Sequence, residues 1–276
     1  MLNLIPIHDE NPTLRRAWVT ITLIAINLVV FLLEPVAMSF SGNPTTAQAA
    51  CHQEAFFRRW AAIPRELTTN RQLPITIEDN RPPRVEGNQV ACPVGRPNFD
   101  KIPALSVLYA MFLHGSWLHL LGNMLFLWVF GNNVEDRLGR VRYLFFYLVC
   151  GYAATYGFAL ADPNSVTTLV GASGAIAGVL GAYLILFPRA RVTSLVPFLL
   201  FLPARLPAWI VLGSWFVLQW FYAQGASVGT GAGVAYLAHV VGFIAGMVLI
   251  ILLGGLMRNR RPPPPPTWQQ WQSPYR

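Results

Sequence analysis

Ser173 and His239 stand in otherwise apolar stretches and could together perform nucleophilic catalysis. Ser173 belongs to the sequence GASG at 171–174, and His239 belongs to AHVVG at 238–242. A serine hydroxyl is a weak nucleophile until a base takes its proton. An imidazole can be that base and can later protonate a leaving amine. The two residue types therefore predict amide hydrolysis by a serine nucleophile.

A second set of polar residues, His114, His119 and Asn123, lies in the apolar stretch 111–130. Steps of five and four place them near one face of a helix, with His114 turned somewhat away. His119 and Asn123 could donate hydrogen bonds to a developing oxyanion. The first amides of a helix that starts near Ser173 could assist, because such amides lack helical partners.

These residues also have structural explanations. A serine in a membrane helix usually bonds its own backbone or a neighbouring helix. Gly174 and Gly178, like Gly242 and Gly246, are four residues apart and would let two helices pack closely. Close packing is equally what a Ser–His hydrogen bond requires, so the two interpretations are compatible.

The composition predicts that these residues lie in a membrane. Hydrophobic residues make up 54% of the 276 residues and charged residues only 12%, whereas soluble domains carry about 25% charged residues. Most of the apolar stretches approach the ~20 residues that a helix needs to cross a bilayer. The six stretches are 17–36, 111–130, 143–160, 170–187, 207–222 and 234–256.

The arginines set the expected orientation, because short cytoplasmic loops are enriched in Lys and Arg. Both termini and the arginine-bearing links are therefore expected in the cytoplasm, and the residues at 37–110, here called the outer segment, on the other side. The arginines concerned are Arg15 and Arg16, then Arg137, Arg140 and Arg142, then Arg189, Arg191 and Arg205, and finally Arg258, Arg260 and Arg261.

This orientation brings the polar residues to one depth. The second, fourth and sixth stretches all run from outside to inside, and each carries its polar residues in its outer half. No Asp or Glu lies in these outer halves. A Ser173–His239 dyad without a third, acidic member is therefore predicted.

The remaining organisation is simple. We expect a cytoplasmic N-terminus at 1–16, a six-span domain at 17–256 and a cytoplasmic tail at 257–276, whose proline run 262–266 is a spacer or a docking motif.

Cys51 and Cys92 fall in the outer segment, where an oxidising compartment favours a disulfide; two unpaired cysteines are the alternative. Cys150 should be a free, buried thiol. Glu135 should cap or pair with a nearby arginine.

Other ligand classes have little support. The net charge of +8 follows from the arginines that flank the spans, and no nucleic-acid-binding motif accompanies it. No CxxC pair is present. A metal site made of His114, His119 and His239 is weakened by the lack of a carboxylate or thiol near them. No cofactor is expected.

The motifs closely resemble the rhomboid family of intramembrane proteases. The matching pieces extend over 111–246 and include His114, His119, Asn123 and the segments 171–175 and 238–242. The resemblance implies an all-α bundle of six transmembrane helices, a water-filled cavity open outward, and hydrolysis without metal or cofactor. Its expected substrates are transmembrane proteins, surrounded by membrane lipid, and its expected location is a bacterial inner membrane. The resemblance implies nothing about the oligomeric state.

The resemblance also assigns roles by position. It makes Ser173 the nucleophile and His239 the base, and it places His119 and Asn123 at the oxyanion hole. Supporting positions are His114, Gly171 and Gly174.

Two departures from the family pattern concern the surroundings of the dyad. Leu105 and Ser106 stand about where many members have a Trp-Arg pair. Ala177 stands where some members have an aromatic residue against the histidine. Another group must then orient His239, and Tyr156 or Trp215 are the aromatic candidates.

Three functions compete with the protease. A catalytically silent relative that binds membrane clients usually lacks the serine or the histidine, and both are present here. A transporter or channel built around buried histidines would make the GASG sequence incidental. A metal protein built on the three histidines is weakened by the lack of a carboxylate or thiol near them.

Overall fold

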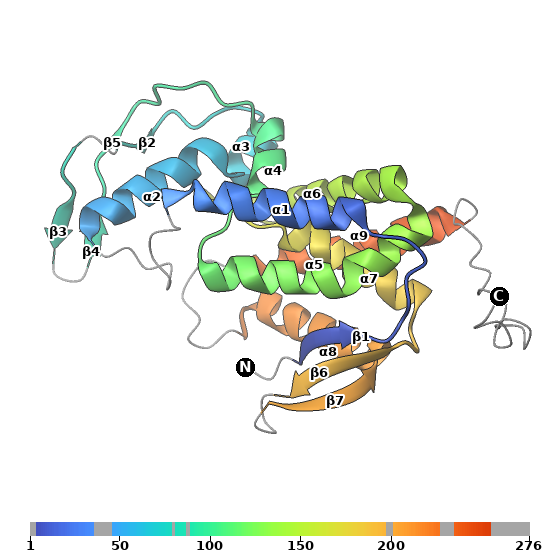
Figure 1. Ribbon diagram of the computed structural model, residues 1–276. Coiled ribbons are helices and arrows are strands. Elements are labelled where there is room, and N and C mark those ends of the chain that lie inside the picture. The colour runs from blue at the N-terminus through green and yellow to red at the C-terminus, as the bar shows by residue number, and fades with distance from the viewer. Residues whose placement is uncertain are drawn as a thin grey trace, which may run out of the picture.

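Helices form most of the chain, which we describe from a computed structural model over residues 4–35, 46–78, 81–86, 89–196, 201–226 and 235–254. Each of the six apolar stretches contains a helix, as predicted, and these helices pack into one bundle (Figure 1). The six are α1 (Trp18–Leu32), α5 (Trp117–Leu138), α6 (Arg140–Ala161), α7 (Ser173–Leu186), α8 (Ala208–Phe221) and α9 (Tyr236–Leu252).

The helix α7 is the centre of the bundle, and all its residues from 175 to 183 are buried. It packs closely against α9 because both helices present glycines at the contact. A Cβ atom on Gly242 would overlap the carbonyl oxygen of Gly174, and one on Gly246 would overlap that of Gly178. The close approach predicted from the glycine spacing is thus confirmed, with backbone lying directly against backbone.

The second apolar stretch differs from its prediction. The helix α4 (Pro103–Ala110) precedes it, and α5 begins only at Trp117, where the Ser116 hydroxyl accepts a hydrogen bond from the His119 amide at 3.1 Å. A serine in this position is a strong helix N-cap. His114 therefore lies in the turn before α5, and the expectation that it shares a helix face with His119 is wrong.

A small sheet was not predicted. The strands β1 (Ile5–Asp9), β6 (Arg191–Val196) and β7 (Leu202–Pro207) form an antiparallel sheet in the order β1-β6-β7, beside α8 (Figure 1). Burial alternates along β6, as expected for a strand with one covered face. The chain is therefore mostly helical rather than all-α, and the N-terminal residues are part of the fold.

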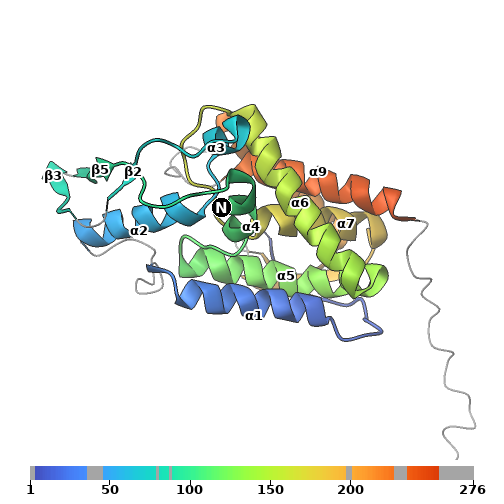
Figure 2. The same cartoon turned by 90° about the horizontal axis from the view of Figure 1, so that it is seen from above.

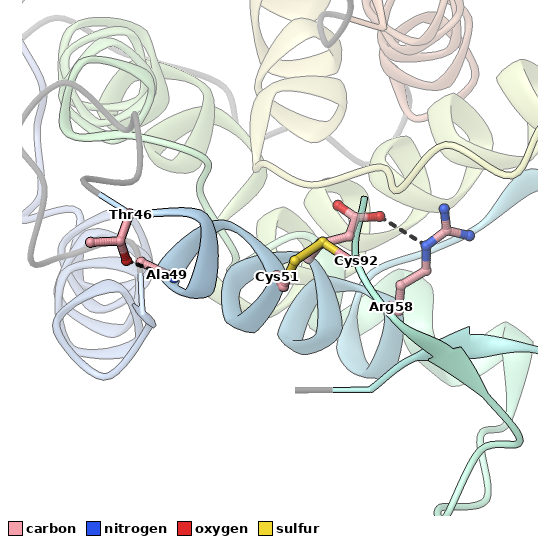
Figure 3. Close-up of a disulfide and its surroundings, with 6 residues drawn as sticks. Thr46, Ala49, Cys51, Arg58 and Cys92 are labelled. Carbon is pink, nitrogen blue, oxygen red and sulfur yellow. Dashed lines mark hydrogen bonds and ion pairs between the residues drawn. A yellow bond between two sulfur atoms is a disulfide. The ribbon is translucent and has the colours of Figure 1, made fainter. Parts of the chain in front are cut away.

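The outer segment has a structure of its own. It contains α2 (Ala47–Trp60), α3 (Pro64–Thr69) and the short strands β2 (Thr76–Ile77), β3 (Arg84–Glu86), β4 (Gln89–Ala91) and β5 (Val94–Gly95), and it projects beyond one end of the bundle (Figure 2). Thr46 caps α2 by accepting a hydrogen bond from the Ala49 amide. Cys51 and Cys92 form a disulfide, with their Cα atoms 5.4 Å apart (Figure 3). Cys150 is free and buried, as expected.

A buried ion pair fixes the base of the outer segment. The Lys101 ammonium lies 2.7 Å from the Glu66 carboxylate, and both side chains are almost completely buried. The same ammonium donates hydrogen bonds to the carbonyl oxygens of Arg58 and Ala61. The end of α2 and the first turn of α3 are thereby tied to Lys101, shortly before α4.

Helix length does not by itself decide the number of membrane crossings. Within the described residues, α6 is the one helix that is both long and apolar enough to cross a membrane, judged by length and composition. The helices α1, α7 and α9 are apolar but shorter. Six crossings therefore remain a prediction. The proline run at 262–266 lies outside the described residues.

Candidate active site

Ser173 is the first residue of α7, which places its hydroxyl at the helix N-terminus. The preceding Gly171 has φ +117°, a backbone conformation that side chains with a Cβ atom rarely adopt. Its amide donates a hydrogen bond to the Ala110 carbonyl at 2.8 Å, so the end of α4 holds the turn. Glycine here lets the chain bend sharply into α7 and present Ser173 to the interior.

His239 lies in the first turn of α9, opposite Ser173. Its Nε2 atom is 2.7 Å from the Ser173 hydroxyl oxygen. The glycine contact between α7 and α9 explains how side chains 66 positions apart reach hydrogen-bonding distance. The structure thus brings together the two residues from which the sequence predicts a dyad.

A third group contacts the histidine from α8. The Nδ1 atom of His239 lies 2.8 Å from the side-chain oxygen of Gln219, which is only 5% exposed. This amide is not among the site residues predicted from the sequence, because only an acidic side chain was considered as a third member. A polar residue near the outer end of an otherwise apolar stretch, at the depth of Ser173, was the signal that could have found it.

Aromatic rings also surround His239. The Trp215 ring lies 6.0 Å from the imidazole, tilted by 30°, and the Tyr236 ring lies 6.3 Å away, edge-on. Tyr156 instead stacks on Tyr152. Of the two aromatic candidates for orienting His239, only Trp215 contacts it in the described structure.

His119 and Asn123 face the turn before Ser173. A Cβ atom on Gly171 would lie 2.8 Å from His119 Nε2 and 3.6 Å from Asn123 Nδ2. The Asn123 Nδ2 atom is buried and has no hydrogen-bond partner among the described residues. His119 Nδ1 accepts a hydrogen bond from the Gly115 amide at 3.4 Å, so Nε2 carries the ring proton. Both side chains therefore offer a donor close to Ser173.

His114 is separate from the Ser–His pair and supports the turn before α5. It is fully buried, and its amide donates to both carboxylate oxygens of Glu34 at 3.2 Å. Its ring packs edge-on against His119, with ring centroids 5.1 Å apart. Glu34, which is not among the predicted site residues, thus helps to position His119 through His114.

A cavity of about 470 Å³ opens beside these residues. The residues that line it include no Asp or Glu, and no group of three His, Cys, Asp or Glu side chains that could hold a metal ion occurs in the described part of the chain. The polar residues of the lining include Ser173, His239, Gln219, Asn123, His119 and Tyr236.

Comparison with known proteins gives one family. The model of the Rhomboid domain matches residues 104–256. The chain is 31% identical over 150 residues to Rhomboid protein 1, mitochondrial, of Saccharomyces cerevisiae, covering 52% of this chain and 40% of that protein. It is 30% identical over 138 residues to Rhomboid protease GlpG of Yersinia pestis, covering 50% of this chain and 44% of that protein. It is 35% identical over 153 residues to Rhomboid-like protease 5 of Toxoplasma gondii, covering 51% of this chain and 15% of that protein. The chain thus spans less than half the length of each of these relatives.

Proposed function

The chain belongs to the rhomboid family, and from this we propose that it is an intramembrane serine endopeptidase that cuts transmembrane protein substrates. The observation that carries the proposal is the 2.7 Å contact between Ser173 and His239 beside an open cavity. Two of the relatives named above are called proteases, which supports the same chemistry.

The proposed reaction begins when His239 Nε2 takes the Ser173 proton and the serine oxygen attacks the substrate carbonyl carbon. His119, Asn123 and the first amides of α7 stabilise the resulting oxyanion. His239 then gives its proton to the leaving amine, and the C–N bond breaks. A water molecule, activated by the same histidine, hydrolyses the acyl-enzyme and regenerates Ser173.

The proposed membrane arrangement has six crossings within residues 17–256, with the segments 1–16 and 257–276 in the cytoplasm. The 14 residues of α7 span roughly 21 Å at about 1.5 Å per residue, less than the ~30 Å of a hydrocarbon core. If α7 ends at the cytoplasmic boundary, Ser173 at its other end lies below the outer surface, and the cavity supplies water.

A bacterial inner membrane is the proposed location. The Saccharomyces cerevisiae relative is named as a mitochondrial protein. Family membership therefore supports residence in a membrane, and the type of membrane rests on the sequence resemblance alone.

Cleavage of a reporter transmembrane substrate in liposomes tests the proposal. We expect Ser173→Ala and His239→Ala each to lower the rate by several orders of magnitude, and the double variant to be scarcely slower, because the two groups act as a unit. Ser214→Ala is the matched control, since this serine of α8 is exposed and its hydroxyl donates to the Val211 carbonyl of the same helix.

The same experiment separates the protease from a silent client-binding relative. A fluorophosphonate probe should label the wild type at Ser173 and leave Ser173→Ala unlabelled. Wild-type protein that binds the reporter but neither cuts it nor takes up the probe would favour the silent relative, and unchanged cleavage by Ser173→Ala would disprove the dyad.

A further inference from the structure

Gln219 is buried in an apolar helix, which is costly for an amide unless its polar atoms are paired. Its neighbours along α8 are aromatic or aliphatic, and its side chain lines the cavity. The side-chain oxygen lies 2.8 Å from His239 Nδ1, on the opposite side of the imidazole from Ser173. Ser173, His239 and Gln219 therefore form a continuous hydrogen-bonded chain across three helices.

We infer that Gln219 is a positioning residue that fixes the tautomer and the ring orientation of His239. The inference rests on the proposed function and names a third member for its Ser–His pair. A neutral imidazole has one protonated nitrogen and one acceptor. Because a carbonyl oxygen can only accept, Gln219 selects the tautomer with the proton on Nδ1. The Nε2 lone pair then faces the Ser173 hydroxyl, as a general base requires.

The opposite orientation of the amide would not support the reaction. If the Gln219 side-chain nitrogen faced His239, it would donate to Nδ1, and the ring proton would move to Nε2. The histidine would then donate to the Ser173 oxygen and could not take its proton. Once His239 becomes protonated on both nitrogens, only the oxygen of Gln219 still makes a hydrogen bond. The oxygen-facing orientation is thus the one that serves every step.

An amide suits this position better than a carboxylate would. A charged residue at membrane depth is expensive, and the residues that line the cavity include no Asp or Glu. A neutral acceptor orients the imidazole without burying a second charge. This explains how the site can lack an acidic third member and still hold its base in a defined state.

Activity of two variants of Gln219 tests the role. Gln219→Met keeps the length of the side chain and removes the acceptor, and Gln219→Glu keeps an acceptor. We expect Gln219→Met to lower kcat about 10- to 100-fold, by analogy with the loss of a group that orients a metal-bound histidine, with KM nearly unchanged. Gln219→Glu should retain more activity, and the acidic limb of its kcat/KM profile should move to higher pH, because a carboxylate stabilises the imidazolium. Ser214→Ala, from the same helix, should behave as the wild type.

A spectroscopic readout separates this inference from the proposed function. The chain has five histidines, so ¹⁵N-histidine spectra of full-length protein in micelles, compared with those of His239→Ala, identify the His239 signals. We expect the Nδ1-protonated tautomer in the wild type and a mixture in Gln219→Met. If the protein shows these tautomers but does not cleave the reporter substrate, the proposed proteolysis is wrong and the contact between Gln219 and His239 stands.

Two results would overturn the inference. One is an Nε2-protonated His239 in the wild type. The other is a Gln219→Met variant with unchanged tautomer and unchanged kcat. If Gln219→Met does not fold, the kcat/KM profile of Gln219→Glu tests the inference instead. An acidic limb at the same pH as in the wild type would show that the side chain at 219 only fills space and would overturn the inference.

Discussion

Asn123 carries a buried side-chain nitrogen without a hydrogen-bond partner in the described structure, next to the turn before Ser173. An unpaired buried donor costs free energy, which is understandable if a transient oxyanion is its partner. Removing one donor from an oxyanion hole typically lowers kcat by ~10²–10³. We expect Asn123→Ala to do so with little change in helix content, as measured by circular dichroism and cleavage rate.

The control for Asn123 is another buried amide of the bundle. Asn27 in α1 donates to the Leu23 carbonyl and does not line the cavity. Asn27→Ala should therefore affect stability rather than turnover. Normal turnover in Asn123→Ala, together with a loss of stability like that of Asn27→Ala, would instead assign Asn123 to helix packing.

Asp9 of β1 connects the sheet to the bundle, because its carboxylate accepts hydrogen bonds from Tyr183 of α7 and Asn133 of α5. Burial raises the pKa of this carboxyl above its ordinary value, although these hydrogen bonds oppose the shift. The folded protein therefore holds the Asp9 proton more tightly than the unfolded chain.

The resulting pH dependence has a definite sign. The contribution of Asp9 to the free energy of unfolding is fully present below the ordinary pKa of 3.8. It is lost as pH rises through the raised folded-state pKa. Asp9→Asn should remove this part of the decline in the free energy of unfolding with rising pH. Thermal unfolding of wild type and variant from pH 3 upward measures it. An identical pH profile in the two proteins would contradict it.

At the level of single residues, sequence reasoning finds groups whose presence in a membrane is costly. Ser173, His239, His119 and Asn123 were all singled out as polar residues at one depth, and the structure brings them together around one cavity. Gln219 was not predicted, because only ionisable side chains were considered as a third residue beside Ser173 and His239. The contact of Glu34 with the turn at His114 joins residues 80 positions apart and is not encoded in any local pattern.

Between the helices α7 and α9, backbone lies against backbone, and this contact sets the distance between Ser173 and His239. Gly246→Ala would place a methyl group into the Gly178 carbonyl, which cannot move without shifting the helix. We expect a loss of about 1–3 kcal/mol in unfolding free energy, as for other overpacked interiors, and slower cleavage because the helices separate. Thermal unfolding in micelles and the reporter assay measure both effects.

Gly213 on α8 supplies the comparison, since a Cβ placed there meets no described atom within 4 Å apart from those of its chain neighbours and its own helix backbone. Gly213→Ala should keep full activity and gain a little stability, because alanine restricts the unfolded chain more than glycine does. Equal effects of the two substitutions would show that helix propensity, and not the close contact, matters.

At the start of α1, Glu135 of α5 acts as a cap. Its carboxylate accepts hydrogen bonds from the amides of Val19 and Thr20 and from the Thr20 hydroxyl, so the capping role, one of the two expected for it, is confirmed. Helix N-termini favour negative charge. Glu135→Gln should therefore cost about 1.5–3 kcal/mol, the value of hydrogen bonds to a charged group, and leave the folded fraction fully active.

The matched change is Glu54→Gln in α2, which removes only a partly exposed ion pair with Arg58 and should cost almost nothing. Chemical denaturation in micelles measures both variants. A folded Glu135→Gln protein without activity would instead link this position to catalysis.

Among the elements, the helices of the bundle were predictable because each needs a long apolar stretch, and their ends were less so. The helix α5 continues well beyond the predicted end at residue 130, to Leu138. The strand β1 is short and pairs with β6 across 190 positions (Ile5 with Leu195), so nothing in the local sequence identifies that partner.

Over the whole molecule, the outer segment touches the turn that leads to Ser173. Ala62 and Leu169 exchange two backbone hydrogen bonds, and the Arg65 amide donates to the Ser165 carbonyl at 3.0 Å. The sequence predicted an outer segment of this length but could not show that it contacts the site, because both partners lie in irregular chain. The α3 region thereby links the conformation of the outer segment to the position of Ser173.

The disulfide between Cys51 and Cys92 closes a loop of 41 positions within this segment. By the loop-entropy model such a closure contributes roughly 3–4 kcal/mol, although measured gains often fall short. The joint substitution Cys51→Ser with Cys92→Ser should therefore expose residues 70–100 to limited proteolysis. It should slow substrate cleavage only modestly, since the Lys101–Glu66 ion pair still holds the base of the segment. Cys150→Ser, which removes a free thiol from the bundle, is the control and should leave the protease pattern of the segment unchanged. Mass spectrometry of a non-reduced digest checks the bond directly: Cys51 and Cys92 both alkylated without prior reduction, in protein purified from its own membrane, would rule it out.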